Sequence, residues 1–260
     1  MNRIEELFNT KKKDILSIYF TAGFPKRDDT ATLLHILQQE GADIIEIGIP
    51  FSDPMADGPV IQHSNDVALS NGMSIPLLFE QLRDIRKHIR VPLILMGYLN
   101  PILQYGVEAF LKKASETGID GIILPDLPLD DYLEHYKDVF EAHGLKNIFL
   151  VTPQTSEERI RKIDSYSTSF IYLVSSYSIT GSKSEFSPYQ LEYFERIKHL
   201  KLKNPGLIGF GISSHQTFTT ACNYNSGAII GSAFIRMIEN SKHYENDISQ
   251  FIHAIKEPAK

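Results

Sequence analysis

The chain has 260 residues, of which 26 are lysine or arginine and 32 are aspartate or glutamate, so its formal net charge at pH 7 is −6. This length suits one large domain, and the mildly acidic balance argues against a nucleic-acid groove or an anionic membrane surface as the partner. The one cysteine, Cys222, cannot form an internal disulfide, so the composition gives no sign of an oxidising compartment.

The N-terminal segment predicts a short amphipathic helix, because Ile4, Leu7 and Phe8 have helical spacing. It lacks the apolar core of a signal peptide, and no apolar run in the chain reaches the roughly 18 residues of a membrane span. We therefore expect a cytoplasmic protein.

Eight short apolar runs then alternate with longer stretches of helical spacing. We predict strands at Ile15–Thr21, Ile44–Ile49, Pro92–Met96, Gly121–Leu124, Asn147–Val151, Phe170–Val174, Leu207–Gly209 and Ala228–Ile230. We predict helices near Asp28–Glu40, Ile75–Ile89, Val107–Thr117, Asp130–Ala142, Ser156–Ser165, Tyr189–Lys198, Ser213–Asn223 and Ser232–Glu239, with a closing helix at Asp247–Lys256. Ser213 with Gln216 predicts a capping box at the start of one of them.

The strands are near-continuously apolar, which is typical of a parallel sheet buried on both faces. Eight strand–helix units without a break in composition favour one closed barrel over two doubly wound domains. The prediction is a single (β/α)8 TIM barrel over residues 1–260, with a short N-terminal helix and an extra C-terminal helix.

One strand of this barrel carries a glutamate. Strand residues alternate faces, so the isoleucines at positions 45, 47 and 49 suit the helix layer and Glu46 faces the barrel interior. Partial desolvation would raise the pKa of this carboxyl toward the range useful for general acid catalysis. The alternative is a structural glutamate paired with a buried Arg or Lys, but no predicted strand core contains either residue. We favour catalysis.

The loop after this strand holds three prolines and a glycine around Asp57. A stiff loop can hold a carboxylate over a pocket, but an Asp beside Gly58 is equally typical of a simple turn, so both interpretations stand. For Asp53 in the same loop the turn is the better interpretation. Three loop and strand carboxylates without a histidine at ligand spacing do not indicate a metal site.

Glycine-rich turns follow the last two strands, at Gly209–Ser214 and Gly231–Ala233, and each runs directly into a helix. Glycine lets backbone N–H groups approach an anion closely, and many barrels bind a substrate phosphate at these two places. The alternative, two tight connections that merely need glycine, we weigh below phosphate binding.

Other polar and aromatic positions are less specific. The long polar segment Ser175–Phe186 has the composition of a mobile lid or of an exposed connector. Tyr19 lies on the opposite face from its apolar neighbours and would line the pocket beside Glu46, although aromatic core filling explains both Tyr19 and Tyr172. The nine histidines fall mostly on helices or loops, and none is assigned a catalytic role.

Together these segments resemble the tryptophan synthase alpha subunit family over essentially the whole chain. The most specific match is the continuous motif Glu46–Pro59. Four further segments match in the family's order: Tyr19–Gly23, Thr180-Gly181, Gly209–Ser213 and Gly231–Ala233. The chain contains no tryptophan, which agrees with an enzyme made when tryptophan is scarce.

The resemblance implies a lyase of tryptophan biosynthesis that cleaves indole-3-glycerol phosphate by retro-aldol reaction to indole and glyceraldehyde 3-phosphate. The family's acid/base glutamate falls on Glu46, which would protonate the indole ring carbon and help to remove the glycerol hydroxyl proton. Its aspartate falls on Asp57, which would stabilise positive charge at the indole N–H. The phosphate-binding positions fall on Gly181, Phe210, Gly211, Gly231 and Ser232, the lid threonine on Thr180 and two pocket positions on Tyr19 and Tyr172.

The resemblance also implies a partner. The family's alpha subunit pairs with a pyridoxal-phosphate-dependent beta subunit, with an alpha2beta2 tetramer expected, so we expect no cofactor and no metal in this chain. The loop with Asp53 and Asp57 would lie near the interface, and indole passes to beta by a tunnel. Ser178 replaces a lid glycine of many members and Ser176 replaces an arginine of some, which puts lid closure and coupling to beta in doubt.

Two rival interpretations differ in class. Another phosphate-binding barrel, such as a sugar-phosphate isomerase or indole-3-glycerol phosphate synthase, would share the two glycine turns. It would not need the proline-rich Asp57 loop, and the synthase would be expected to place lysines at strand ends. A non-catalytic subunit that only activates beta is the second alternative, and retention of both Glu46 and Asp57 argues against it.

Overall fold

The computed structural model describes residues 2–175 and 185–257. Its strands form one parallel sheet in the order β5-β4-β3-β2-β1-β9-β8-β7-β6. The strands are β1 Ile15–Thr21, β2 Ile44–Gly48, β3 Leu93–Met96, β4 Gly121–Ile123, β5 Lys146–Ile148, β6 Leu150–Val151, β7 Ile171–Val174, β8 Gly206–Gly209 and β9 Gly227–Ile230. β5 and β6 are two parts of one strand interrupted at Phe149, so the sheet closes on itself as an eight-stranded barrel.

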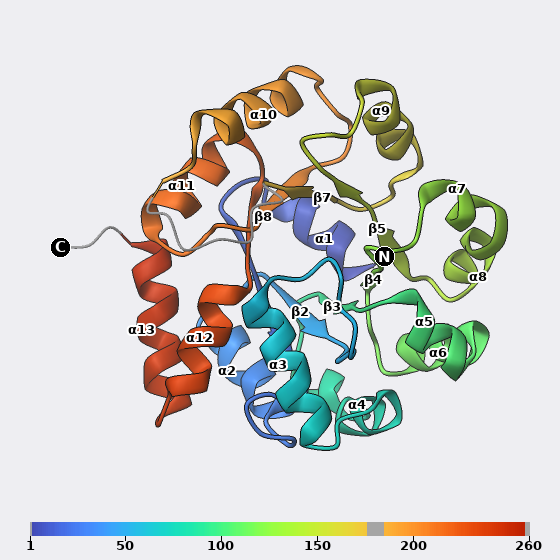
Figure 1. Cartoon of the computed structure of the whole chain (residues 1–260), viewed down its shortest axis with the longest axis vertical. Coiled ribbons are helices and arrows are strands. Elements are labelled where there is room, and N and C mark those ends of the chain that lie inside the picture. The colour runs from blue at the N-terminus through green and yellow to red at the C-terminus, as the bar shows by residue number, and fades with distance from the viewer. Residues whose placement is uncertain (1, 176–184, 258–260) are drawn as a thin grey trace.

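Helices surround this barrel (Figure 1). In the first half they are α1 Arg3–Thr10, α2 Thr30–Gln39, α3 Pro59–Ser70, α4 Ile75–Gln81, the 3-10 turn Ile85–Lys87, α5 Leu99–Tyr105 and α6 Val107–Glu116. In the second half they are α7 Leu129–Asp131, the π-turn Tyr132–Tyr136, α8 Lys137–Ala142, α9 Glu157–Tyr166, α10 Pro188–His199, α11 His215–Tyr224, α12 Ser232–Asn240 and α13 Tyr244–Lys256. The predicted (β/α)8 barrel is confirmed.

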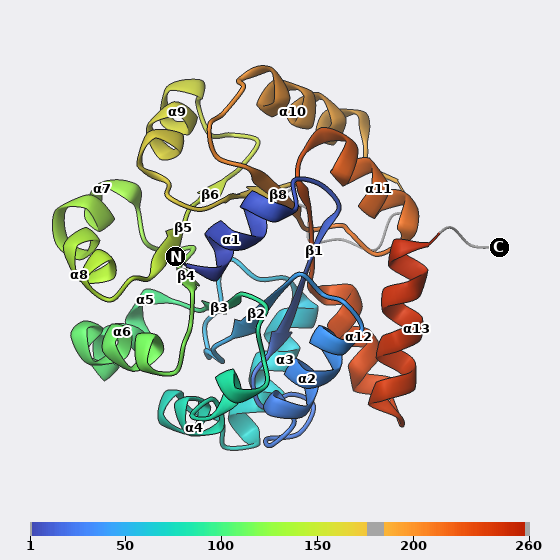
Figure 2. The same cartoon turned by 180° about the vertical axis from the view of Figure 1, so that it is seen from behind.

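The two additional helices are also present. α1 buries Ile4 and Phe8 and lies across the end of the barrel where the strands begin (Figure 2). α13 packs against α2, α11 and α12 on the outside of the ring. Within the described ranges, no helix combines the length and apolar character needed to cross a membrane.

Four local predictions were wrong. We predicted no helix at α3, whose buried face includes the polar residues Ser64 and Asn65, so the apolar periodicity of this helix is weak even though Pro59 at its first turn is a good start signal. The helix predicted at Ile75–Ile89 ends at Gln81, and the seven-residue α5 was not predicted.

The fourth concerns the capping box of α11. It starts at Ser214, one residue later than predicted, and its reciprocal partner is Thr217 rather than Gln216. Because Ser214 and Thr217 keep the three-residue spacing, the motif is present but shifted in register.

Charged residues hold α1 to the barrel. The buried Asp120 carboxylate, just before β4, accepts hydrogen bonds from Arg86 and Arg3 and from the backbone N–H of Leu93. β5 begins at Lys146, one residue earlier than predicted, so one strand does contain a lysine. Its ammonium donates to Glu5 of α1 at 2.6 Å, at the opposite end of the barrel from the proposed chemistry.

We expect Asp120→Ala to lower the free energy of unfolding by about 3–5 kcal/mol, because it leaves the largely buried Arg86 without its counter-charge. Arg3→Ala is the matched control. Its side chain is 40% exposed, so its loss should cost only about 0–1 kcal/mol. Urea unfolding of the two variants measures the difference, and equal losses would contradict this account.

Candidate functional site

The predicted site residues lie on five adjacent strands or directly after them. Across the sheet these strands follow the order β2, β1, β9, β8 and β7. β2 contributes Glu46, β1 contributes Tyr19 and β7 contributes Tyr172, while β9 and β8 lead into the two glycine turns. Residues far apart in the sequence therefore line one side of the barrel interior.

Glu46 is fully buried on the inner face of β2, as predicted. Its Oε1 accepts a hydrogen bond from the Ser17 hydroxyl at 2.7 Å, and its Oε2 has no hydrogen-bond partner among the described residues. Desolvation raises the pKa of this carboxyl to about 7, and the Ser17 hydrogen bond opposes the increase. The group can therefore exchange its proton near neutral pH.

Asp57 is buried as well, in the connection between β2 and α3. Its Oδ2 accepts a hydrogen bond from the Tyr98 hydroxyl at 3.0 Å, and the same hydroxyl accepts from the backbone N–H of Ala56 at 3.0 Å. Desolvation raises the pKa of Asp57 to about 6, partly offset by Tyr98. This supports the interpretation of Asp57 as a held carboxylate rather than an exposed turn residue.

Asp53 lies in the same loop as Asp57 but in a different environment. It is exposed, and its carboxylate accepts a hydrogen bond from Ser52 at 2.6 Å, within the same loop. This local contact agrees with the prediction that Asp53 forms a turn.

Tyr19 and Tyr172 each lie over a glycine of the next strand. A Cβ at Gly48 would stand 2.2 Å from the Tyr19 hydroxyl oxygen, and a Cβ at Gly209 would stand 2.3 Å from that of Tyr172. The pKa of each tyrosine is raised first by desolvation and then by the charges of Glu46 and Asp57, so all four groups lie within electrostatic reach. The rings therefore line the same interior space as both carboxyls.

The two predicted phosphate turns are neighbours, because β8 and β9 pair directly. Phe210 and Gly211 have φ values of 69° and 77°, and the Ser175 hydroxyl fixes this turn by donating to the Phe210 carbonyl at 2.6 Å. Gly231 precedes α12, and no side chain among the described residues caps this helix. In this part of the chain the first N–H groups of α12, from Ser232 onward, are therefore left for an anion.

Sequence comparison places this geometry in a family. The profile of the tryptophan synthase alpha chain family matches residues 6–260. The tryptophan synthase alpha chain of Flavobacterium psychrophilum is 58% identical over 255 residues, covering 98% of this chain and 100% of its own. That of Phocaeicola vulgatus is 54% identical over 257 residues, with coverage of 98% and 100%. The chain belongs to the tryptophan synthase alpha chain family.

Solved structures agree with this assignment. Tryptophan synthase subunit alpha from Legionella pneumophila superimposes with a TM-score of 0.87 at 36% identity, covering 98% of this chain and 97% of that one. A chain of tryptophan synthase from M. tuberculosis, in an aminoacrylate-bound form, gives a TM-score of 0.85 at 27% identity, with 98% of each chain covered. As a member of this family, the chain is a lyase that acts on indole-3-glycerol phosphate in tryptophan biosynthesis.

Part of the predicted lid lies outside the residues that the structure describes. Thr180 and Gly181, like Ser176 and Ser178, lie outside the described residues. Two residues of the candidate site were not predicted from the sequence, Ser17 and Tyr98, which donate hydrogen bonds to Glu46 and Asp57. Ser17 shares the inward face of β1 with Tyr19, so strand alternation could have indicated it, whereas no sequence signal indicates Tyr98.

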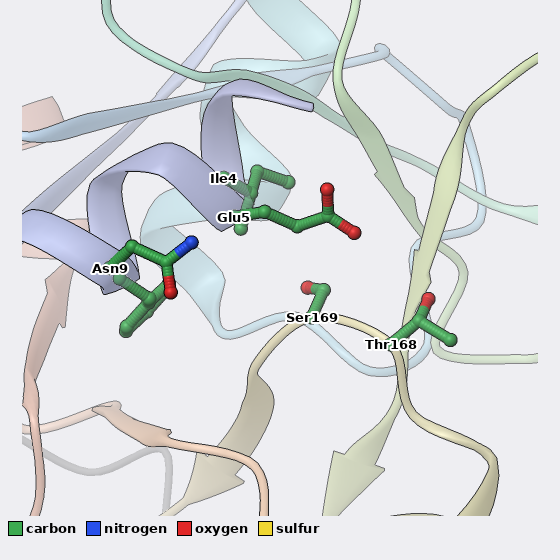
Figure 3. Close-up of a pocket in the computed structure, with 6 residues that line it drawn as sticks. Ile4, Glu5, Asn9, Thr168 and Ser169 are labelled. Atoms are coloured by element: carbon green, nitrogen blue, oxygen red, sulfur yellow. The ribbon is translucent and has the colours of Figure 1, made fainter. Parts of the chain in front are cut away.

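A surface cavity of about 350 Å³ lies beside α1, at the end of the barrel where the strands begin (Figure 3). Its lining residues are Ile4, Glu5, Phe8, Asn9, Thr168 and Ser169. They come from α1 and from the segment before β7, where the strands begin. None of the predicted site residues that the structure describes lines this cavity. This face of a TIM barrel contributes to stability rather than to catalysis.

Burial of Glu46 makes the stability of the protein depend on pH. Its pKa of about 7 exceeds its ordinary value of 4.5, so the folded chain binds more protons than the unfolded chain between these values. The free energy of unfolding therefore falls as pH rises through this window. We expect Glu46→Gln to be more stable than the wild type by roughly 2 kcal/mol at pH 8 and nearly equal to it at pH 5.

Urea unfolding at both pH values measures this difference. Glu134→Gln, on an exposed helical surface, is the control and should not change the pH dependence. A Glu46→Gln variant that is destabilised equally at pH 5 and pH 8 would show that packing, not ionisation, dominates at this position.

Tyr98→Phe removes the donor to Asp57 and the acceptor for Ala56. We expect a loss of about 1–2 kcal/mol of stability at pH 8, where Asp57 is ionised, and a smaller loss at pH 5. Tyr105→Phe, in a half-buried ring that packs on Phe79 and Phe110, is the control and should give no such pH difference. Urea unfolding again provides the measurement, and a loss independent of pH would contradict the role given to the hydroxyl.

Proposed function

We propose that Glu46 and Asp57 are the catalytic residues for cleavage of indole-3-glycerol phosphate in this chain. The observation that carries the proposal is a fully buried carboxyl on the inner face of the barrel, Glu46, with a pKa of about 7 and no basic partner among the described residues. A structural glutamate at such a position would normally be paired with a cation.

The reaction needs one proton to move between two sites of the substrate. The indole ring carbon must gain a proton, the glycerol hydroxyl must lose one, and the bond between ring and side chain then breaks to give indole and glyceraldehyde 3-phosphate. The two transfers balance, so one carboxyl can serve both. A pKa near the working pH is the most effective value for this, and such catalysis contributes about 10²–10⁴-fold to the rate.

Asp57 has the complementary role. Protonation of the ring carbon places positive charge on the indole N–H, and a carboxylate in a partly dry site stabilises that charge strongly. At pH 7 and above Asp57 is mostly ionised, and its bond to Tyr98 holds it in position. Tyr19 and Tyr172 would contact the indole and glycerol portions.

The substrate phosphate would bind between the two glycine turns. Phe210, Gly211, Gly231 and Ser232 supply backbone N–H groups and a helix N-terminus there, which suit an anion without a bound cation. Gly181 would add a further contact and Thr180 would engage Asp57 from the lid.

The proposed assembly follows the family. We propose that residues 1–260 act as a single domain that associates with a tryptophan synthase beta subunit, in an alpha2beta2 tetramer. Pyridoxal phosphate belongs to that partner, and this chain needs no cofactor or metal of its own. We also propose a cytoplasmic location, consistent with the single cysteine.

The proposal is tested by measuring indole release from indole-3-glycerol phosphate, with the chain alone and with a matching beta subunit. We expect Glu46→Gln and Asp57→Asn each to lower kcat by at least about 10²-fold. Glu134→Gln and Asp138→Asn, two exposed carboxyls on the outer surface, are the controls and should retain full activity. Wild-type chain that releases no indole even with beta would instead support the non-catalytic, activating subunit.

A further inference from the structure

We propose that Ser17 is the positioning residue for Glu46: its hydroxyl holds Oε1 inside the barrel and keeps the ionised form of the carboxylate accessible. This inference rests on the proposed role of Glu46. On this inference, the reaction depends on Ser17 although Ser17 does not contact the substrate.

The geometry comes from the register of two neighbouring strands. Tyr19 on β1 pairs with Glu46 on β2, and Ser17 lies two residues earlier on β1, on the same inward face. The Ser17 hydroxyl donates to Oε1 across the two strands at 2.7 Å, and this contact fixes the Glu46 carboxyl in the barrel interior. Oε2 is left without a hydrogen-bond partner in the described part of the chain, so it is the oxygen available for proton transfer.

Of the described groups around Glu46, Ser17 is the one that favours the charged form of the carboxyl. Ile94 on β3, on the other side of Glu46, is apolar. Tyr19 on β1 and Tyr172 on β7 have raised pKa values and stay neutral at working pH, and Asp57 carries charge of the same sign. A hydroxyl that donates to the carboxylate stabilises its ionised form.

The burial of the Ser17 hydroxyl is a second argument for this contact. Ser17 is fully buried, and a buried hydroxyl is costly unless it is hydrogen-bonded. Its proton goes to Oε1, so the two buried polar groups satisfy one another. A purely structural position between apolar strands would be filled equally well by alanine.

The test is Ser17→Ala, a change of one buried atom. We expect the pKa of Glu46 to rise by about one pH unit, and the corresponding midpoint in the pH profile of kcat/KM to move upward by the same amount. The pKa is measured without any substrate, by 13C NMR titration of glutamate-labelled protein in which Glu46→Gln identifies the signal. Labelling only glutamate excludes Asp57 from the measurement.

Two further variants complete the design. Ser17→Thr retains the hydroxyl and should restore both midpoints toward the wild type. Ser64→Ala removes another fully buried serine, whose hydroxyl contacts Thr21 rather than Glu46, and should leave the Glu46 midpoint unchanged.

The outcomes separate this inference from the proposed function. A Glu46 pKa and a kcat/KM profile that both stay unchanged in Ser17→Ala, while Glu46→Gln is inactive, would overturn the role of Ser17 alone. A raised Glu46 pKa in Ser17→Ala together with an active Glu46→Gln would support the contact and overturn the catalytic role of Glu46. An equal shift in Ser64→Ala would also overturn the inference, because the effect would then be general to the core.

Discussion

The cost of removing a carboxylate from water is the constraint on which this site depends. In bulk water a glutamate is ionised at neutral pH and is a poor acid. Inside the barrel Glu46 loses its hydration and receives one hydrogen bond in return, which brings its two protonation states close in free energy. Among the described residues, burial between the strands and not a cation sets this balance, so the chemistry of the group depends on closure of the sheet around it.

The two ends of the barrel differ in how their side chains and backbone are held. Where the strands begin, α1 covers the core and Asp120 satisfies two guanidinium groups and a backbone N–H. Where the strands end, glycine turns, uncapped helix N–H groups and left-handed backbone at Phe210 remain. The left-handed backbone at Phe210 costs stability locally, and under the proposed function a bound substrate phosphate would offset that cost.

The barrel could be predicted from the sequence because its strands are continuous apolar runs, and the inward direction of Glu46 followed from strand alternation alone. The helix α3 could not, since its inward face carries Ser64 and Asn65, which bury polar groups that periodicity treats as exposed. The bond from Tyr98 to Asp57 joins residues 41 positions apart on two different loops, and only the fold brings them together. Roles in the lid segment, at Thr180 and Gly181, remain predictions.

The two tyrosine-over-glycine contacts limit how this pocket can change in evolution or in the laboratory. Each ring occupies the volume that a side chain at Gly48 or Gly209 would need. The tyrosine and the glycine of each pair therefore have to change together. A larger residue at Gly48 requires a smaller one at Tyr19, and a larger residue at Gly209 requires a smaller one at Tyr172. Redesign of the cavity for a different ring system would proceed by such paired, volume-conserving exchanges, because a single substitution at either partner leaves a clash or a void.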